Sequence, residues 1–208
     1  VDKVESFRPE SVERVEIERA PNGTLWLAVL YNDQFYLYEH TPEGWNDYVV
    51  ETMPAQFKDQ SLWRFEVDWE NQLQLVRQIS PIGFYHITGT PGEWSNAIIN
   101  NIEEFPGDSR EFEMTGMEMR KNNTPIIHVR GEFKLGESSD YFCGTIFSND
   151  GDWEAAETWS EYYGVTAYDH ARDRVHCSDV QGFDEGRYWS VPLGDDSRAA
   201  YTPSQDMV

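Results

Sequence analysis

The chain has 208 residues, of which 39% are hydrophobic and 14% aromatic, and it carries 38 acidic against 16 basic side chains. The abundance of aromatic rings argues against a disordered chain, and the net charge of −22 excludes polyanionic partners such as nucleic acid and anionic membranes. No apolar run approaches the roughly 20 residues of a membrane-spanning helix, so membrane insertion is not expected. The charge favours a basic protein partner, bound cations or a marine or halophilic source. No signal peptide is visible, and the compartment stays open between extracellular and cytoplasmic.

The chain repeats itself. Residues 35–45 read FYLYEHTPEGW, residues 84–94 read FYHITGTPGEW, and residues 142–153 read FCGTIFSNDGDW. An aromatic residue begins each segment, turn residues come after it, and a tryptophan ends it. A fainter fourth copy lies within residues 187–201. Repeated strand-rich units of roughly 40–50 residues, each of which would contain one of these segments, are typical of propeller blades.

Each copy is expected to form a meander of short strands. In the first copy, Asn22-Gly23, Asn32-Asp33 and Pro42-Glu43-Gly44 separate four aliphatic and aromatic runs, as turns do between strands. The two-residue link at Asn32-Asp33 is the length of a tight hairpin. The predicted strands of this copy are 14–18, 25–31, 34–40 and 47–51.

The other copies share the same plan. Their predicted strands are 64–68, 72–78, 83–88 and 95–100, then 111–119, 125–129, 140–147 and 153–158, and finally 165–168, 174–178, 187–191 and 199–202. We therefore expect an all-β, β-propeller-like fold of about four blades, each with four antiparallel strands. No low-complexity linker divides the chain, which predicts a single domain over 1–208. The expected blades are 12–52, 61–102, 110–160 and 164–203.

Two motifs carry a family resemblance. The segment Ser148-Asn149-Asp150-Gly151-Asp152-Trp153 resembles the Asp-box repeat of propellers. The pairing of VLY and FYLYE with a following Gly-Trp looks like the blades of fucose-binding lectins, in which an Arg, a Glu and a Trp hold the sugar. That resemblance implies that Glu39 and Trp45 contact a glycan, although residues 27–31 contain no arginine. The blade count is similar to that of hemopexin-like domains.

The tryptophans form two groups. Trp45, Trp94 and Trp153 recur in register, which favours a structural role between blades. The others do not recur, and irregular aromatic residues on a repeat scaffold are candidates for a specific site. The predicted ligand-binding residues, led by the two that flank one strand, are Trp63, Trp69, Trp26, Glu39 and Trp189. The alternative is that these rings simply fill the core.

Acidic turns offer oxygen ligands for a metal ion. Calcium prefers several carboxylate and carbonyl oxygens, so calcium is a candidate cofactor at Asp150, Asp152, Asp195 and Asp196. The alternative is that these are ordinary turn residues. Cys143 and Cys177 lie in strand-like runs, where the sequence favours buried thiols and leaves a disulfide between neighbouring sheets as the alternative.

Catalytic motifs are sparse. Sialidases are propellers that use a tyrosine, an aspartate and several arginines, and Tyr162, Asp169, Arg172 and Arg174 supply these residue types. Such enzymes need six blades, and this chain has room for four. His170 comes directly after Asp169 and forms either an Asp/His pair or part of a turn, with the turn favoured.

The sequence therefore predicts a non-enzymatic binding module that recognises a protein or a glycan through loops and exposed aromatic residues. The alternatives are a sialidase-like hydrolase, a structural subunit of a virion or surface layer, and an acidic inhibitor of a basic partner.

Overall fold

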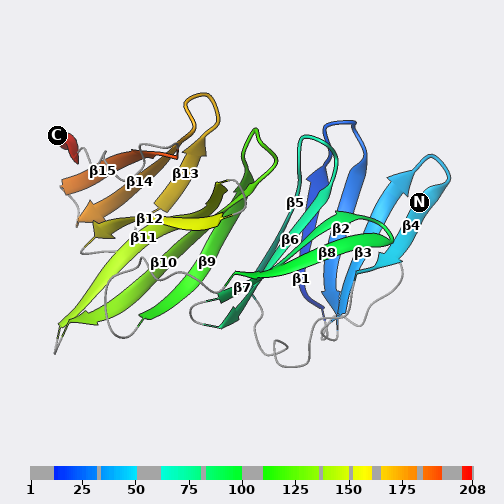
Figure 1. Cartoon of the computed structure of the whole chain (residues 1–208), viewed down its shortest axis with the longest axis horizontal. Coiled ribbons are helices and arrows are strands. Elements are labelled where there is room, and N and C mark those ends of the chain that lie inside the picture. Colours follow the sequence, from blue (N-terminus) through cyan, green and yellow to red (C-terminus); the bar gives the residue numbers. More distant parts are fainter. Residues whose placement is uncertain are drawn as a thin grey trace. The chain divides into compact units, whose positions relative to one another are not determined.

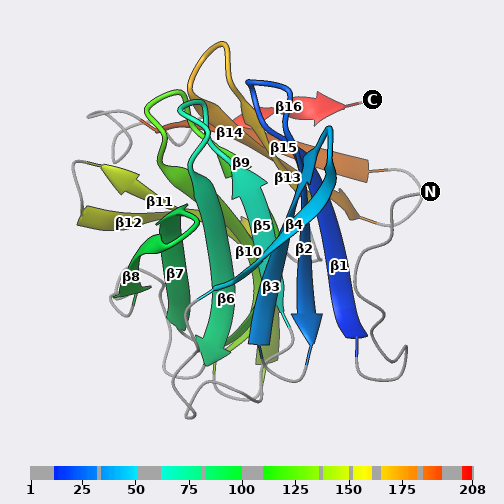
Figure 2. The ribbon, with the colours of Figure 1, turned by 90° about the vertical axis from the view of Figure 1, so that its right-hand side faces the viewer.

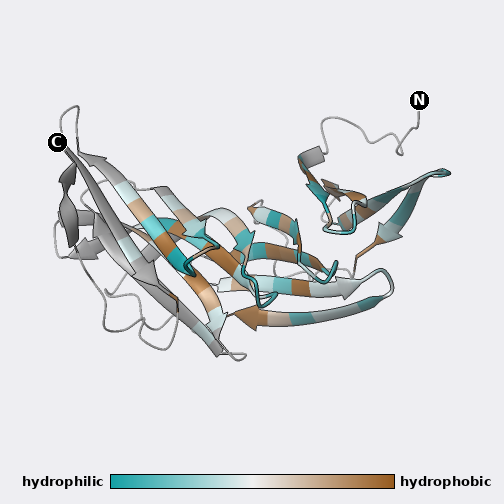
Figure 3. Cartoon of the chain, turned by 90° about the horizontal axis from the view of Figure 1, so that it is seen from above, coloured by the Kyte–Doolittle hydropathy of each residue, from teal (hydrophilic) through white to brown (hydrophobic). Residues whose placement is uncertain are grey.

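Alternation of apolar and polar side chains along the chain produces strands throughout the described residues. The computed structural model describes residues 12–31, 34–50, 62–80, 83–99, 110–135, 138–149, 152–160, 165–181, 185–193 and 203–207. Within these ranges every regular element is a strand (Figure 1). Hydrophobic and hydrophilic residues alternate along them (Figure 3), because successive side chains of a strand point to opposite faces.

The described residues form sixteen strands in four sheets, each a meander of four consecutive antiparallel strands. The first sheet contains β1 (Val12–Arg19), β2 (Leu25–Tyr31), β3 (Gln34–Thr41) and β4 (Gly44–Val49). The second contains β5 (Trp63–Val67), β6 (Leu73–Ser80), β7 (Gly83–Thr90) and β8 (Glu93–Ile99).

The third sheet contains β9 (Arg110–Met119), β10 (Pro125–Leu135), β11 (Ser138–Asn149) and β12 (Asp152–Ser160). The fourth contains β13 (Val165–Asp169), β14 (Arg174–Gln181), β15 (Glu185–Pro192) and β16 (Pro203–Met207). The predicted all-β class with four four-stranded antiparallel units is confirmed. The last strand occupies Pro203–Met207, while the segment predicted for it, 199–202, lies outside the described residues.

The chain divides into two compact units, Val1–Ile99 and Asn100–Val208. Each unit contains two of the sheets. That residues 1–208 form a single domain stays a prediction. Within the part of the chain that the structure describes, no helix is long and apolar enough to cross a membrane.

The core of the first unit lies between its two sheets, whose strands run side by side (Figure 2). Each contributing strand places residues two positions apart into it, as one face of a strand must. These residues include Ala28 and Leu30, Phe35 and Leu37, Trp63 and Phe65, Leu73 and Leu75, and Tyr85 and Ile87. The Phe35 and Trp63 rings meet edge to face with centroids 5.2 Å apart. Burying each leucine, isoleucine or phenylalanine of this set stabilises the unit by about 1.5–3 kcal/mol.

The second unit has an apolar cluster and a covalent link between its sheets. Ile126, Phe147, Tyr168, Val175 and Leu193 pack together. Cys143 of β11 and Cys177 of β14 are buried and form a disulfide. The interpretation of the two cysteines as free thiols is therefore wrong, and the alternative, a disulfide between neighbouring sheets, is the correct one.

Candidate functional site

In three of the described sheets, the same type of tight turn joins the first two strands. In each, the amide of the fourth turn residue donates to the carbonyl of the first, over 2.8 Å in β1–β2, 3.0 Å in β5–β6 and 3.1 Å in β9–β10. The donating residues have positive φ angles of 92°, 66° and 65°, and they are Gly23, Asn71 and Asn123. Gly and Asn adopt this conformation at the lowest cost, and the pattern is that of a three-residue hairpin loop. The residue at the second turn position, which we call the tip residue, is therefore held on a defined backbone.

The tip residue of the β5–β6 turn is Trp69, and its side chain is 52% exposed. Beneath it, Asp68 is buried and accepts hydrogen bonds from the amides of Glu70 (2.9 Å) and Gln72 (2.8 Å) and from Nε2 of Gln74 (2.9 Å). A buried carboxylate with three donors fixes the turn. The large apolar ring thus projects from a rigid support.

The support continues into the sheet through His86. Nε2 of His86 lies 2.8 Å from Oε1 of Gln74. Because Nε2 of Gln74 donates to Asp68, its Oε1 is the acceptor for a histidine N–H, which places the proton of the neutral ring on Nε2. Burial lowers the pKa of His86 to about 4, so the ring stays neutral near neutral pH.

In each unit a side chain from the second sheet's turn reaches the first sheet's turn. In the first unit, Oδ1 of Asn71 accepts the backbone N–H of Asn22 at 2.9 Å. In the second unit, Asp173 also has a positive φ, 49°, and its carboxylate binds the guanidinium of Arg120 through Nε (3.1 Å) and Nη2 (2.6 Å). Asn71 therefore has a double role, since it closes its own turn and joins the two turns of the first unit, whereas Asp173 joins the two turns of the second.

Arg120 is bound from several sides. Its side chain is only 7% exposed, and it also donates to the carbonyls of Ser148 (3.2 Å) and Leu193 (2.9 Å). The Tyr168 hydroxyl donates to Asp173 at 2.6 Å. Burial, together with the hydrogen bond and charge of Asp173, raises the pKa of Tyr168 to about 12. The phenol is consequently a fixed donor and not a ready nucleophile.

An open pocket of about 380 Å³ lies between these two turns of the second unit. Lys121, Asn122, His170 and Arg172 line it together with the Arg120–Asp173 pair. The pocket gathers basic side chains on a chain of strongly negative charge.

Glu118 connects the two sheets of this unit. It accepts from His128 Nε2 (3.1 Å) and from the Tyr168 amide (3.3 Å), and it lies 3.6 Å from His170 Nε2. Burial acts to raise the pKa of Glu118, but His128, the Tyr168 amide and the charge of His170 outweigh it, and the net direction is down. His170 thus pairs with a carboxylate of the neighbouring sheet.

Asp169 is paired with Arg172 at 2.8 Å and lies 3.7 Å from His176. The turn interpretation of this segment is confirmed, because residues 170–173 form the turn that joins β13 to β14. The guanidinium of Arg174 binds Ser190 of the adjacent strand through Nε at 2.6 Å. The two arginines therefore have separate partners and do not converge on one ligand as a carboxylate-gripping cluster would. Tyr162, the candidate nucleophile, lies outside the described residues.

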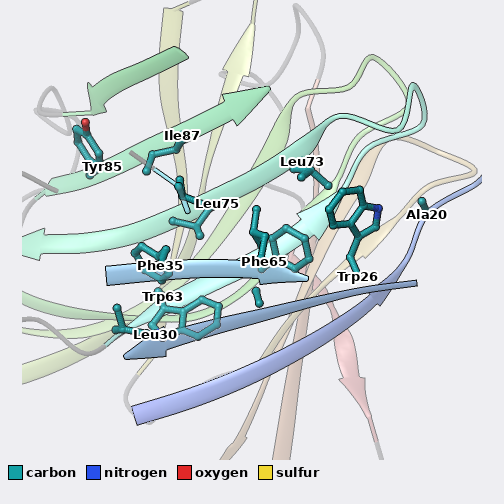
Figure 4. Packing of buried hydrophobic residues seen from close by; sticks show 13 residues of the cluster. Ala20, Trp26, Leu30, Phe35, Trp63, Phe65, Leu73, Leu75, Tyr85 and Ile87 are labelled. Carbon is teal, nitrogen blue, oxygen red and sulfur yellow. The ribbon is translucent and has the colours of Figure 1, made fainter. Parts of the chain in front are cut away.

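The predicted ligand-binding tryptophans differ in how far they are exposed. Trp63 is fully buried and Trp26 nearly so, and both lie in the first core (Figure 4). Their assignment to a ligand site is corrected, because rings enclosed by both sheets present no surface to a ligand. Trp69 is exposed, as a binding residue must be. For Trp189 the structure describes the strand but not the side chain.

Glu39 and Trp45, the pair implied by the lectin resemblance, lie on opposite faces of the first sheet. Directly paired residues share a face, and Glu39 pairs with Asn46 while Trp45 pairs with His40. Glu39 instead accepts the Tyr48 hydroxyl at 2.9 Å. The pair therefore cannot close on one sugar.

The recurring tryptophans have packing neighbours. The Trp45 ring meets His40 edge to face at 4.9 Å, and Trp94 packs against the first core. Of the calcium candidates, Asp150, Asp195 and Asp196 lie outside the described residues, as does the side chain of Asp152. Calcium stays a prediction. The described part of the chain holds no group of three or more His, Cys, Asp or Glu side chains placed to hold a metal ion.

The joined turns are the feature that sequence reasoning misses. In the sequence Asn22-Gly23 serves only as a separator of two strands. In the structure Asn71 and Asn123 occupy the position of Gly23 in the first turn of the second and third sheets. Aligning these turns, in addition to the tryptophan-ending segments, would identify Trp69 and Lys121 as tip residues.

Comparisons with known proteins leave the family open. No family model matches, and no curated protein matches. Among solved structures, the chain is similar to the WD40 domain of SCAP from fission yeast, with 8% identity, a TM-score of 0.38, and coverage of 98% of this chain and 68% of that one. A similarity of this size does not assign a family, and the fold described above rests on the chain's own strand pairing.

Proposed function

We propose that the chain is a non-catalytic interaction module that binds a protein partner through the turn end of its first unit, with Trp69 as the principal contact. The observation that carries the proposal is a large apolar ring, half exposed, on a turn fixed by three hydrogen bonds to Asp68. Tryptophan is among the residues most enriched at the energetic centre of protein interfaces. A rigid support lowers the entropy that is lost on binding.

Charge supports a basic partner. The exposed Glu70 comes directly after Trp69, and the whole chain carries a net charge of −22. Such a field speeds the approach of a basic surface and repels acidic ones. We therefore expect the partner to present an apolar pocket bordered by lysines or arginines.

The test begins with photo-cross-linking. Benzoylphenylalanine at position 69, compared with the same probe at the exposed Val49 of the same unit, is used to identify a partner, which is then purified and titrated calorimetrically. Trp69→Ala is expected to weaken binding by about 30-fold, the loss of ~2 kcal/mol typical of an interface centre. Val49→Ala is expected to leave the affinity unchanged. Raising the salt concentration is expected to slow association.

Two other outcomes would replace the proposal. A hit on a glycan array that Trp69→Ala abolishes would assign the turn to glycan recognition. Equal cross-linking from positions 69 and 49, or a partner affinity that Trp69→Ala does not change, would show that this turn is not the binding surface.

A further inference from the structure

Two tripeptides of the chain have the form Asn-x-Thr with x other than proline. They are Asn22-Gly23-Thr24 and Asn122-Asn123-Thr124, and no other asparagine of the 208 residues has Ser or Thr two positions later. This triplet is the acceptor motif for N-linked glycans on surface loops of secreted proteins.

Both tripeptides occupy the same three positions of the same turn. In each, the asparagine directly precedes the positive-φ residue, Gly23 or Asn123, and the threonine comes directly after it. Asn22 and Asn122 are both exposed. The β5–β6 turn, which shares this geometry, carries Glu70 at the corresponding position. A turn tip has room for a bulky substituent that a strand within a sheet would lack.

The side-chain amides have the same orientation. Oδ1 of Asn22 accepts the Thr24 amide at 2.9 Å. Oδ1 of Asn122 accepts the Thr124 amide at 3.3 Å and the Thr124 hydroxyl at 2.7 Å. The turn therefore holds the oxygen of each side-chain amide. The nitrogen Nδ2 at the other end of the amide is the atom that would bear the sugar.

The disulfide is a second, independent observation. Cys143 and Cys177 are joined within the second unit, and disulfides persist in oxidising compartments such as the secretory lumen and the cell exterior. N-linked transfer acts on chains that enter the same route. The disulfide and the two Asn-x-Thr tripeptides therefore both indicate the secretory route.

We propose that Asn22 and Asn122 are N-glycosylation sites. The donor is an oligosaccharide linked to a lipid through pyrophosphate. A bond forms between Nδ2 and C1 of the first sugar, the bond between C1 and the phosphate oxygen breaks, the lipid pyrophosphate leaves, and the amide loses one proton.

The two sites differ in the residue after the threonine. Pro125 comes directly after Thr124 and restricts the backbone of that threonine, whereas Leu25 comes after Thr24. We therefore expect Asn22 to be modified more completely than Asn122. A glycan at Asn22 would also border the turn of Trp69, because the Asn22 amide bonds Asn71 of that turn. Glycosylation of Asn22 does not depend on the proposed partner.

The test uses the full chain, purified from its natural source and from a eukaryotic secretory host. Peptide-N-glycosidase in H₂¹⁸O converts a glycosylated asparagine to ¹⁸O-labelled aspartate, which mass spectrometry measures at each position. The same incubation without the enzyme gives the label that arises from spontaneous deamidation of Asn22-Gly23, and this amount is subtracted. We expect the label at residue 22 and, in a smaller fraction of molecules, at residue 122. Asn22→Gln and Thr24→Ala should each remove one gel shift, and Asn122→Gln the other.

Matched variants separate recognition from folding. Thr24→Ser and Asn123→Gly retain both motifs, and the latter reproduces the Asn-Gly-Thr of the first site, so both should stay glycosylated. A folded, disulfide-bonded natural protein without label at residue 22 would overturn the proposal. Loss of the Asn22 gel shift in Thr24→Ser, or an Asn22→Gln variant that migrates like the wild type, would also contradict it.

Discussion

At the scale of single residues, the hydrogen-bond partners of a buried side chain determine whether it carries a charge. Arg120 keeps its charge under nearly complete burial because a carboxylate and two carbonyls satisfy its donors. His86 is bound to the uncharged amide of Gln74 and stays neutral. Protonating His86 would place a charge in the desolvated network that supports Trp69.

His86 predicts a pH dependence of stability. Its pKa in the folded chain, about 4, lies below the ordinary value of 6.5, so the unfolded chain binds the proton first. The contribution of the neutral His86 ring to the free energy of unfolding is complete above pH 6.5, and it is lost as the pH falls from there to about 4. The loss is about 3 kcal/mol at most.

Urea unfolding between pH 7 and pH 4 measures this loss. His86→Gln, which cannot titrate, should flatten the decrease over that range. His40→Gln, a change at an exposed histidine of the same unit, serves as the control and should leave the wild-type profile unchanged. An unaltered profile in His86→Gln would refute the assignment.

At the scale of elements, one glutamate contact joins neighbouring sheets in both units. Oε2 of Glu16 in β1 accepts the Phe65 amide of β5 at 2.6 Å, and Glu118 of β9 accepts the Tyr168 amide of β13. Donor and acceptor are 49 and 50 residues apart. Burial raises the pKa of Glu16 despite the Phe65 amide and the nearby Arg14 and Arg64. The contact satisfies an amide at the edge of each second sheet.

Removing this acceptor should loosen the edge of β5. Glu16→Ala is expected to speed hydrogen exchange of the Phe65 amide by about tenfold, which corresponds to losing one hydrogen bond of about 1.4 kcal/mol. Glu18→Ala, on the same face of β1, is the control. Unchanged exchange at Phe65, measured by NMR, would show that the contact does not protect the strand.

The strands can be predicted from the sequence, whereas the contacts that join one sheet to the next cannot. Strand period, aromatic content and turn residues act over a few positions, so local patterns locate 15 of the 16 strands that the described residues form. Face parity could have placed Trp63 correctly, because it shares a face with Phe65 while Trp69 lies past the strand end. The Glu16–Phe65, Arg120–Asp173 and Cys143–Cys177 contacts connect residues 34 to 53 positions apart, and no local pattern indicates them.

At the scale of the whole molecule, a covalent link distinguishes the second unit. The first unit packs buried apolar side chains between its two sheets. The second unit also buries apolar side chains of its described strands, and the Cys143–Cys177 disulfide joins its sheets in addition. Such a link stabilises the folded unit mainly by constraining the unfolded chain.

Redox conditions should therefore act on one unit only. Cys143→Ala with Cys177→Ala, or reduction by dithiothreitol, is expected to destabilise the second unit by about 4 kcal/mol, the value for a loop closed over a sequence separation of 34 residues. Hydrogen exchange of the strands β9–β16 should accelerate, while that of β1–β8 serves as the internal control. Equal acceleration in both units would contradict a local effect of the disulfide.

The turn that recurs at the head of three sheets separates positions that must keep their residue type from positions that are free to vary. Gly23, Asn71 and Asn123 are constrained by their backbone angle, and few residue types would replace them. The adjacent tip positions already hold Pro21, Trp69 and Lys121, three side chains with nothing in common. Natural selection, or a library screened in the laboratory, can therefore exchange the tips without disturbing the turn backbone. The scaffold is comparable to an antibody framework in this respect: new specificity is available by single substitutions, with little penalty in folding.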